Sequence, residues 1–134
     1  MARQIYVNLP VRDLPRTREF FSALGFTFEP KFSNDDAACM VIAENIFAML
    51  LVEPFFRGFT RKTICDTTQS TEVLICLSCD SRQHVKDLVA KAVAAGGTIA
   101  REEKDHGFMY EHAFEDLDGH TWELVYMEPD AVPA

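Results

Sequence analysis

The pattern of hydrophobic and polar positions predicts the same order of strands and helices twice along the chain. In the first half, IYVNLPV (residues 5–11) has the β-branched and aromatic content of a strand. Asp13 then predicts a helix N-cap, because apolar residues recur at three- and four-residue steps from Leu14 until Gly25. Three short apolar or alternating runs follow, FTFEPKF, AACMVIA and IFAMLLV. The first half therefore predicts the order βαβββ.

The second half repeats this order. A strand is expected in EVLICLSC, and Asp80 is expected to cap an amphipathic helix that ends at Gly96 and Gly97. Further strands are expected around TIARE, in GFMYEHAFED and in TWELVYM, the last after a turn at Asp118 and Gly119. Two copies of one unit predict an α+β fold, in which two βαβββ modules form a curled mixed sheet around a cavity.

The 134 residues are expected to form a single domain. We place module one at about residues 1–53, a connector at about 54–71, module two at about 72–128 and a tail to residue 134. The connector contains Phe55, Phe56 and Phe59, which suggest a helical turn packed on the body or a cover over a cavity. We favour the packed turn, because aromatic side chains are more often structural than functional.

Composition and charge narrow the class of protein. The formal net charge of -8 repels a phosphate backbone, and the basic residues form no stripe, which argues against a nucleic-acid partner. No stretch has the apolar region of a signal peptide or the roughly 20 apolar residues of a membrane span. We therefore expect a cytoplasmic protein with no membrane partner.

The cysteines are expected to be reduced thiols rather than a disulfide framework, because no secretory signal is evident. Cys76 and Cys79 have the spacing of a zinc half-site, but they lie in an expected strand, where residues three apart point to opposite faces. We interpret them as buried strand cysteines. Cys39 has no evident histidine or cationic partner, so a nucleophilic role is not favoured.

The stretches VNLPVRDLPRTREFFSALGF and FEDLDGHTWEL, together with the βαβββ order, resemble the vicinal oxygen chelate superfamily. It includes glyoxalases, extradiol dioxygenases, fosfomycin-resistance enzymes and bleomycin-binding proteins. NIFAMLLVE, CDTTQSTEV and HGFMYEHAFEDLDGHTWE are most similar to its predicted lactoylglutathione lyase branch. The resemblance implies a small organic molecule as partner, a homodimer and, in catalytic members, a divalent metal held by two side chains from each module.

By that resemblance, the metal-ligand positions fall at Tyr6, Met49, Val73 and Glu123. Only Glu123 is a usual ligand type, since valine and methionine cannot serve a hard or borderline cation. A catalytic divalent metal generally needs about three protein ligands. We therefore expect no resident cofactor, and Glu123 is a metal ligand only if a metal binds with water or substrate in the remaining positions.

Glu123 is the candidate catalytic residue. Because it stands between the apolar residues Trp122 and Leu124, its carboxylate must be paired with another group, hydrated in a cavity or neutral. Its role is either that of a proton-transfer base facing the pocket or that of a solvated residue at the rim. Tyr6 and Asn8 share strand parity and are expected to orient a ligand, with structural hydrogen bonds as the alternative. The expected ligand-binding residues are Tyr6, Asn8, Met49, Val73 and Tyr110.

Three histidines crowd the C-terminal third without a compact zinc pattern. His120 is interpreted as a turn residue after Asp118 and Gly119. His106 and His112 belong to a stretch that could fold over the pocket, although ligand contact is not favoured.

Three functions remain open. The first is a glyoxalase-like lyase or isomerase that moves a proton next to a carbonyl, with Glu123 as the base, as the resemblance implies. The second is a metal-free protein that sequesters a drug or metabolite in the manner of bleomycin-resistance proteins, which the incomplete ligand set favours. A dimerising scaffold without a useful pocket is a third.

Overall fold

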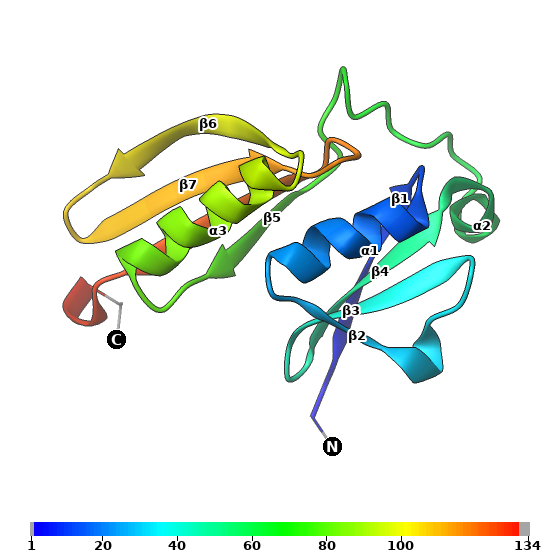
Figure 1. Ribbon diagram of the computed structural model, residues 1–134, viewed down its shortest axis with the longest axis horizontal. Helices are drawn as coiled ribbons and strands as arrows, with labels where there is room; N and C mark the ends of the chain where they lie inside the picture. The colour runs from blue at the N-terminus through cyan, green and yellow to red at the C-terminus, as the bar shows by residue number, and fades with distance from the viewer. Residues whose placement is uncertain (1, 132–134) are drawn as a thin grey trace. The chain divides into compact units, whose positions relative to one another are not determined.

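The computed structural model describes residues 2–131, so the expected tail to residue 134 ends outside the described residues. It divides into two compact units, the first ending at Cys65 and the second beginning at Asp66. We call them module one and module two. Each has a four-stranded mixed sheet with a helix against it (Figure 1). This confirms the predicted α+β class with two βαβββ modules.

Module one has the strand order β1-β4-β3-β2, with β1 and β4 parallel and the other pairs antiparallel. Its elements are β1 (Ile5–Val11), α1 (Leu14–Ala23), β2 (Thr27–Glu29), β3 (Ala37–Ala43) and β4 (Ile46–Val52). Helix α1 starts as predicted, because the side chain of Asp13 accepts a hydrogen bond of 3.1 Å from the N–H of Arg16. It ends before Gly25, whose φ of +101° suits glycine.

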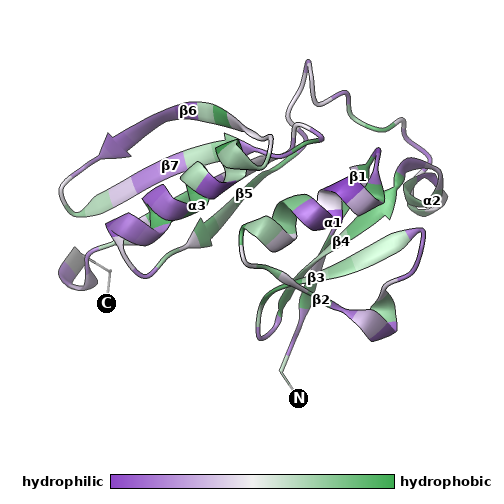
Figure 2. Ribbon diagram, in the orientation of Figure 1, coloured by the Kyte–Doolittle hydropathy of each residue, from purple (hydrophilic) through white to green (hydrophobic). Residues whose placement is uncertain are grey.

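The two faces of the module-one sheet differ because side chains alternate along each strand. Leu9 and Leu50 are paired between β1 and β4 and are buried on the face against which α1 lies. The pairs Tyr6 with Phe47 and Asn8 with Met49 fall on the opposite, open face. Figure 2 shows β3 and β4 to be almost wholly hydrophobic, so the open face is apolar as well as the covered one.

The expected strand in FTFEPKF is shorter than predicted. Only Thr27–Glu29 pairs with β3, and Pro30–Phe32 forms a 3-10 turn, η1. Pro30 has no N–H to donate to a sheet, and its fixed φ suits the first position of such a turn. The Glu29 side chain then caps the turn by accepting a hydrogen bond of 3.1 Å from the N–H of Lys31.

Module two has the equivalent order β5-β8-β7-β6, again with one parallel pair, β5 with β8. Its elements are β5 (Leu74–Ser78), α3 (Arg82–Ala94), β6 (Thr98–Asp105), β7 (Met109–Glu115), β8 (Thr121–Met127) and the 3-10 turn η3 (Pro129–Ala131). Helix α3 lies against β6, β7 and β8. In contrast to β3 and β4, the edge strand β6 is largely hydrophilic (Figure 2).

The N-cap predicted at Asp80 is wrong by one residue. Ser81 is the cap, and its hydroxyl accepts a hydrogen bond of 2.9 Å from the N–H of His84. Serine and aspartate cap helices about equally well, so the sequence did not distinguish the two neighbours. The shift changes which residue of β5 corresponds to Tyr6 of β1, as described below.

His120 is a buried residue rather than a simple turn residue. Its side chain is 1% exposed, and its Nδ1 lies 2.5 Å from Oε1 of Glu72. The adjacent Asp116 carboxylate is also buried and accepts hydrogen bonds from the backbone N–H groups of Asp118, at 2.9 Å, and His120, at 3.0 Å. Its other oxygen accepts a bond of 2.9 Å from Nε1 of Trp122. The β7–β8 turn is therefore held by a buried polar network.

No helix within residues 2–131 combines the length and the apolar character that crossing a membrane requires.

Candidate functional site

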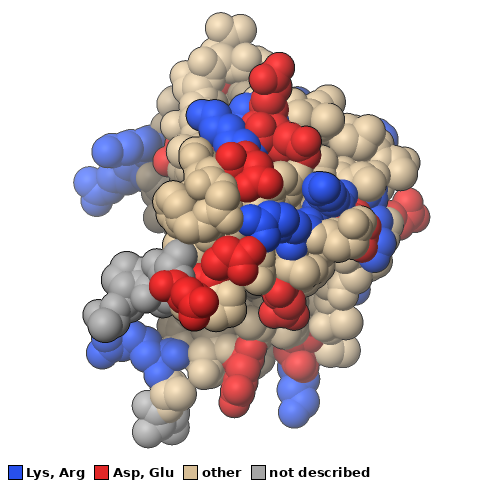
Figure 3. Space-filling view, turned by 90° about the vertical axis from the view of Figure 1, so that its left-hand side faces the viewer, with Lys and Arg blue, Asp and Glu red and all other residues tan. Residues whose placement is uncertain are grey.

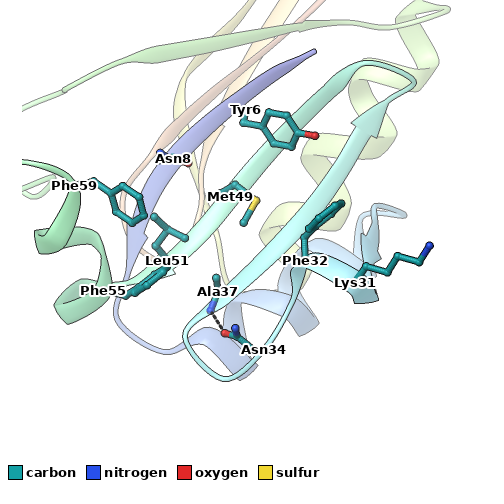
Figure 4. A pocket seen from close by; sticks show the side chains of 10 residues that line it. All are labelled: Tyr6, Asn8, Lys31, Phe32, Asn34, Ala37, Met49, Leu51, Phe55 and Phe59. Atoms are coloured by element: carbon teal, nitrogen blue, oxygen red, sulfur yellow. Dashed lines mark hydrogen bonds between the residues drawn. The ribbon is translucent and has the colours of Figure 1, made fainter. Parts of the chain in front are cut away.

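A cavity of about 490 Å³ opens on module one, and all of its lining residues belong to that module (Figure 4). Its volume lies within the range of small-molecule sites. The floor is the open face of the sheet, where Asn8 and Met49 are paired across β1 and β4. Most of the lining is apolar, from Phe32, Ala37, Met49, Leu51, Phe55 and Phe59.

The connector supplies one wall of this cavity. After β4 the chain forms the helical turn α2 (Glu53–Phe56) and the 3-10 turn η2 (Arg57–Phe59). The rings of Phe55 and Phe59 meet edge to face with centroids 5.3 Å apart. The expected helical turn is present, but these two rings are 41% and 61% exposed and line the cavity instead of packing into the core. The cavity-cover alternative therefore describes them better than the packed turn that we favoured.

Four lining residues bring polar groups: Tyr6, Asn8, Lys31 and Asn34. The Tyr6 ring stacks on Phe47 with centroids 4.8 Å apart, and its hydroxyl donates a hydrogen bond of 2.9 Å to Oε1 of Gln4. Asn8 is exposed on the same face. Among the described lining residues there is no Asp, Glu, His or Cys. The cavity can thus orient a ligand. Tyr6 and Lys31 are the lining residues of a type that can transfer a proton, and the Tyr6 hydroxyl is already bonded to Gln4.

The sequence predicted Tyr6, Asn8 and Met49 for this cavity but missed its outer wall. Lys31, Phe32 and Asn34 come from the turn η1 and the loop after it, which the sequence pattern assigned to a strand and a polar spacer. Only the Asx-turn character of the Ser33–Asp36 stretch could have indicated a fixed side chain there. Their approach to the β1–β4 face depends on sheet pairing, which is not a local property.

The open face of the module-two sheet carries charged groups. Arg101 on β6 and Glu123 on β8 both stand in register with Ala113 of β7, and their side chains meet over it at 2.7 Å. A second carboxylate, that of Glu111, lies 3.6 Å from the same guanidinium. Strand β7 lies between β6 and β8, and the small Ala113 side chain leaves space for this contact across it. Of the three states that the sequence left open for Glu123, paired, hydrated or neutral, the structure shows the paired one, with Arg101 as the partner.

The remaining predicted residues lie elsewhere in module two. Tyr110 is buried, donates a hydrogen bond to Glu103 and lies beneath Lys86 of α3, whose Nζ is 5.5 Å from the ring centroid. Burial first, and then the Glu103 hydrogen bond, raise the pKa of Tyr110 to about 12. The Tyr110 side chain therefore packs on the face of the sheet that α3 covers. His112, on the same strand, is also buried.

The divalent-metal site implied by the resemblance does not fit these residues. Glu123 stands in register with Cys76 on β5, as Met49 does with Asn8 on β1, so Leu74 rather than Val73 corresponds to Tyr6. Neither a leucine nor a valine side chain can bind a metal. Within residues 2–131, no three His, Cys, Asp or Glu side chains gather as a metal ion would require.

The thiols of Cys39, Cys76 and Cys79 offer no alternative nucleophile. Cys76 is exposed, not buried as we expected, because the module-two face on which it lies is open. Although the Cys76 side chain reaches solvent, its surroundings partly shield the sulfur from water, and this partial desolvation, followed by the nearby Glu123 carboxylate, raises the pKa of Cys76. Burial raises that of Cys39. The pKa of Cys79 is raised to about 11, again mainly by burial. A raised pKa keeps these three thiols protonated near neutral pH, and the thiolate is the reactive form.

Surface charges of both signs are mixed on the face shown in Figure 3, where acidic and basic side chains alternate. Within module two, Arg82 forms an ion pair with Glu128, donates a hydrogen bond of 2.7 Å to the carbonyl of Gly107 and lies 3.6 Å from Asp105. The face shown in Figure 3 has no continuous basic stripe of the kind that binds a phosphate backbone.

Comparison with known proteins identifies the fold. Residues 3–43, which span β1 to β3, match the family model described as "Bleomycin resistance protein-like N-terminal". The structure is similar to that of hypothetical protein SA1046 from S. aureus, with 27% identity, a TM-score of 0.79 and coverage of 94% of this chain and 95% of that chain. No curated protein matches the chain.

Two further solved structures share the fold at lower identity. A glyoxalase/bleomycin resistance protein/dioxygenase family enzyme from Burkholderia phytofirmans PsJN is 16% identical, with a TM-score of 0.76 over 94% of this chain and 99% of that chain. The fosfomycin resistance protein FosX from Listeria monocytogenes is 18% identical, with a TM-score of 0.67 over 97% of each chain. Together with the paired βαβββ modules and the family match in module one, these likenesses show that the chain has the glyoxalase/bleomycin resistance fold, and they support its resemblance to the vicinal oxygen chelate superfamily.

Proposed function

We propose that this protein binds a small, largely apolar aromatic molecule in the module-one cavity and holds it without chemical conversion. The observation that carries the proposal is the composition of the lining. Aromatic and aliphatic side chains form most of the wall, a few amide and hydroxyl groups are placed to orient a ligand, and no described lining residue is Asp, Glu, His or Cys. Such a wall can desolvate and align a ring system.

The metal-binding positions support the same function. Among the residues at the superfamily's metal positions, only Glu123 is a usual ligand, and it forms an ion pair with Arg101. Tyr6 is engaged with Gln4 and Phe47, and Leu74 offers no donor, so this set does not favour a cation. A metal-free binding protein of the bleomycin-resistance kind needs no such cation.

The proposal is tested by calorimetric titration with naphthalene-sized planar compounds, with and without a metal chelator. We expect saturable binding that the chelator leaves unchanged, and the compound should be recovered unaltered. Phe59→Ala is expected to weaken binding roughly tenfold, the equivalent of about 1.4 kcal/mol, because it removes an exposed ring from the cavity wall. Phe108→Ala is the matched control, since Phe108 is 54% exposed and does not line the cavity.

If no planar compound binds, or if Phe59→Ala and Phe108→Ala bind equally well, the cavity is not the site. Loss of binding on chelation, restored by one divalent ion, would contradict the metal-free part of the proposal.

A second candidate function is proton transfer next to a carbonyl with Glu123 as the base. The observation that favours it is Nη1 of Arg101, which is buried and has no hydrogen-bond partner among the described residues. A donor of this kind could stabilise an enolate oxygen near the Glu123 carboxylate.

This second function makes its own prediction for Glu123→Gln. Glu123→Gln should turn over an α-carbonyl substrate at least about a hundredfold more slowly than the native protein, since a general base contributes roughly that much or more. Arg101→Lys tests the oxyanion role separately, because it keeps the charge and removes the fork of donors. Turnover that survives Glu123→Gln excludes Glu123 as the base.

A further inference from the structure

Asn34 sits at the edge of the cavity with its side chain locked in one orientation. Its Oδ1 accepts hydrogen bonds from the backbone N–H groups of Asp36, at 2.8 Å, and Ala37, at 3.1 Å. Figure 4 draws the bond to Ala37. Its own backbone N–H donates to the carbonyl of Ala37 at 2.8 Å. Because both side-chain partners are N–H donors, the amide oxygen must face them and the nitrogen cannot.

The fixed orientation of the Asn34 amide decides which of its polar atoms is available to a ligand. The Asn34 side chain lines it, its oxygen is already engaged by two donors, and no described residue accepts a hydrogen bond from its Nδ2. Nδ2 carries two N–H groups and cannot accept. The polar group that Asn34 contributes to a ligand is therefore a donor only, and it is complementary to an oxygen acceptor such as a ketone.

The charges around the cavity argue for an uncharged ligand. Among the described lining residues only Lys31 is ionised at neutral pH. In Figure 4 its side chain extends outward from η1, away from the space between Phe32 and Met49. A buried ionic group on the ligand would lose its water without meeting a counter-charge, and this desolvation is costly. A neutral acceptor avoids most of that cost.

The aromatic groups indicate the shape of the ligand. Tyr6 and Phe32 lie toward one end of the cavity and Phe55 and Phe59 toward the other, with Met49 between them (Figure 4). Ring faces and edges of this kind favour offset or edge-to-face contact with a flat ring system. We propose that the cavity selects an uncharged planar aromatic carbonyl compound and that Asn34 supplies the hydrogen bond to its carbonyl oxygen. This inference rests on the proposed binding function and names the class of ligand.

The first part of the test compares three probes with the same naphthalene ring and one different substituent. Acetylnaphthalene carries a neutral acceptor, ethylnaphthalene carries none, and naphthoate carries a charged one. Titration of the native protein is expected to give a dissociation constant at least about tenfold lower for acetylnaphthalene than for either of the others, since one well-placed hydrogen bond contributes about that much.

The second part uses Asn34→Asp, which changes the donor while preserving the loop. Aspartate keeps an oxygen for the N–H groups of Asp36 and Ala37, and it replaces the cavity-facing NH₂ with an acceptor oxygen. We expect the preference for acetylnaphthalene over ethylnaphthalene to disappear and the binding of naphthoate to weaken further. Asn45→Asp is the matched control, because it adds the same charge to module one at a turn that does not line the cavity.

The outcomes separate this inference from the function on which it rests. If no probe binds, the proposed binding function fails. If the probes bind in a Phe59-dependent manner but ethylnaphthalene or naphthoate binds as tightly as acetylnaphthalene, the carbonyl preference is wrong and the binding function stands. If the preference persists in Asn34→Asp, another group provides the donor and the role of Asn34 is overturned. Unchanged circular dichroism and melting temperature would establish that the variant is folded.

Discussion

Replacing Trp122 with alanine is expected to cause the largest loss of stability of any single change considered for this protein. The side chain is fully buried in module two, and truncating a buried aromatic residue to alanine typically costs about 3–5 kcal/mol. The change also removes the 2.9 Å hydrogen bond from Nε1 to the buried carboxylate of Asp116. Leaving a buried acceptor short of a partner adds about 1–3 kcal/mol.

The Trp122→Phe variant separates the two contributions, because phenylalanine fills most of the space but donates no hydrogen bond. Burial raises the pKa of Asp116, and the bond from Trp122 opposes that rise. The pKa of Asp116 should therefore be higher still in Trp122→Phe. A folded state that binds a proton more tightly gains stability as the pH falls. The difference in unfolding free energy between native protein and Trp122→Phe should accordingly shrink as the pH is lowered from neutral.

Urea unfolding followed by far-ultraviolet circular dichroism measures both variants, since Trp122 is the only tryptophan and its fluorescence is lost. Phe108→Ala serves as the reference for an exposed aromatic residue and should change stability by no more than about 0.5 kcal/mol. A loss below about 1 kcal/mol for Trp122→Ala would show that the module-two core does not depend on this ring.

Gly119→Ala is expected to have the second largest effect. Gly119 has a φ of +84°, and a Cβ at this position would lie 2.8 Å from Oγ1 and 3.0 Å from Cβ of Thr67. The Thr67 hydroxyl donates a hydrogen bond to the carbonyl of Asp118, so it cannot rotate away without losing that bond. Backbone strain and steric overlap together should cost about 2–3 kcal/mol.

Gly25→Ala is the matched control because its φ is +101° and nothing lies within 4 Å of an added Cβ. This variant should lose only the cost of the backbone conformation, about 1 kcal/mol. Adding Thr67→Gly to Gly119→Ala removes the overlapping atoms, and the combined loss should be smaller than the sum of the two single losses. Equal losses for Gly25→Ala and Gly119→Ala would show that contact with Thr67 contributes nothing.

Local sequence signals predicted much of the architecture correctly. Strands β1, β3, β4 and β8 occur at their expected residues, and α1 begins after Asp13 and ends before Gly25. These features depend on side-chain alternation, on the capping of a helix by its own residues and on glycine at a positive φ, all of which act over a few neighbouring positions. The repetition of the order then predicted the paired modules.

The candidate site was predicted only where strand parity or the superfamily resemblance was enough. Tyr6 and Asn8 share one face of β1, so their common orientation followed from the pattern. Met49, which lies beside them, was expected only from the resemblance to the superfamily. The partner of Glu123 did not follow, because Arg101 reaches it across Ala113 from a strand that is not its neighbour. That contact depends on register and on the small size of the residue between them.

The sequence by itself determined most of the secondary structure, the repeat and therefore the two-module α+β fold, because these depend on short-range periodicity and capping. The tertiary structure alone decided how deeply individual side chains are buried and which loops meet the sheet. It buried His120 beside Glu72 and left Cys76 exposed, contrary to expectation in both cases. It also brought Asn34 and Phe59 to one cavity, because sheet pairing and the turn after β4 place distant segments on the same face.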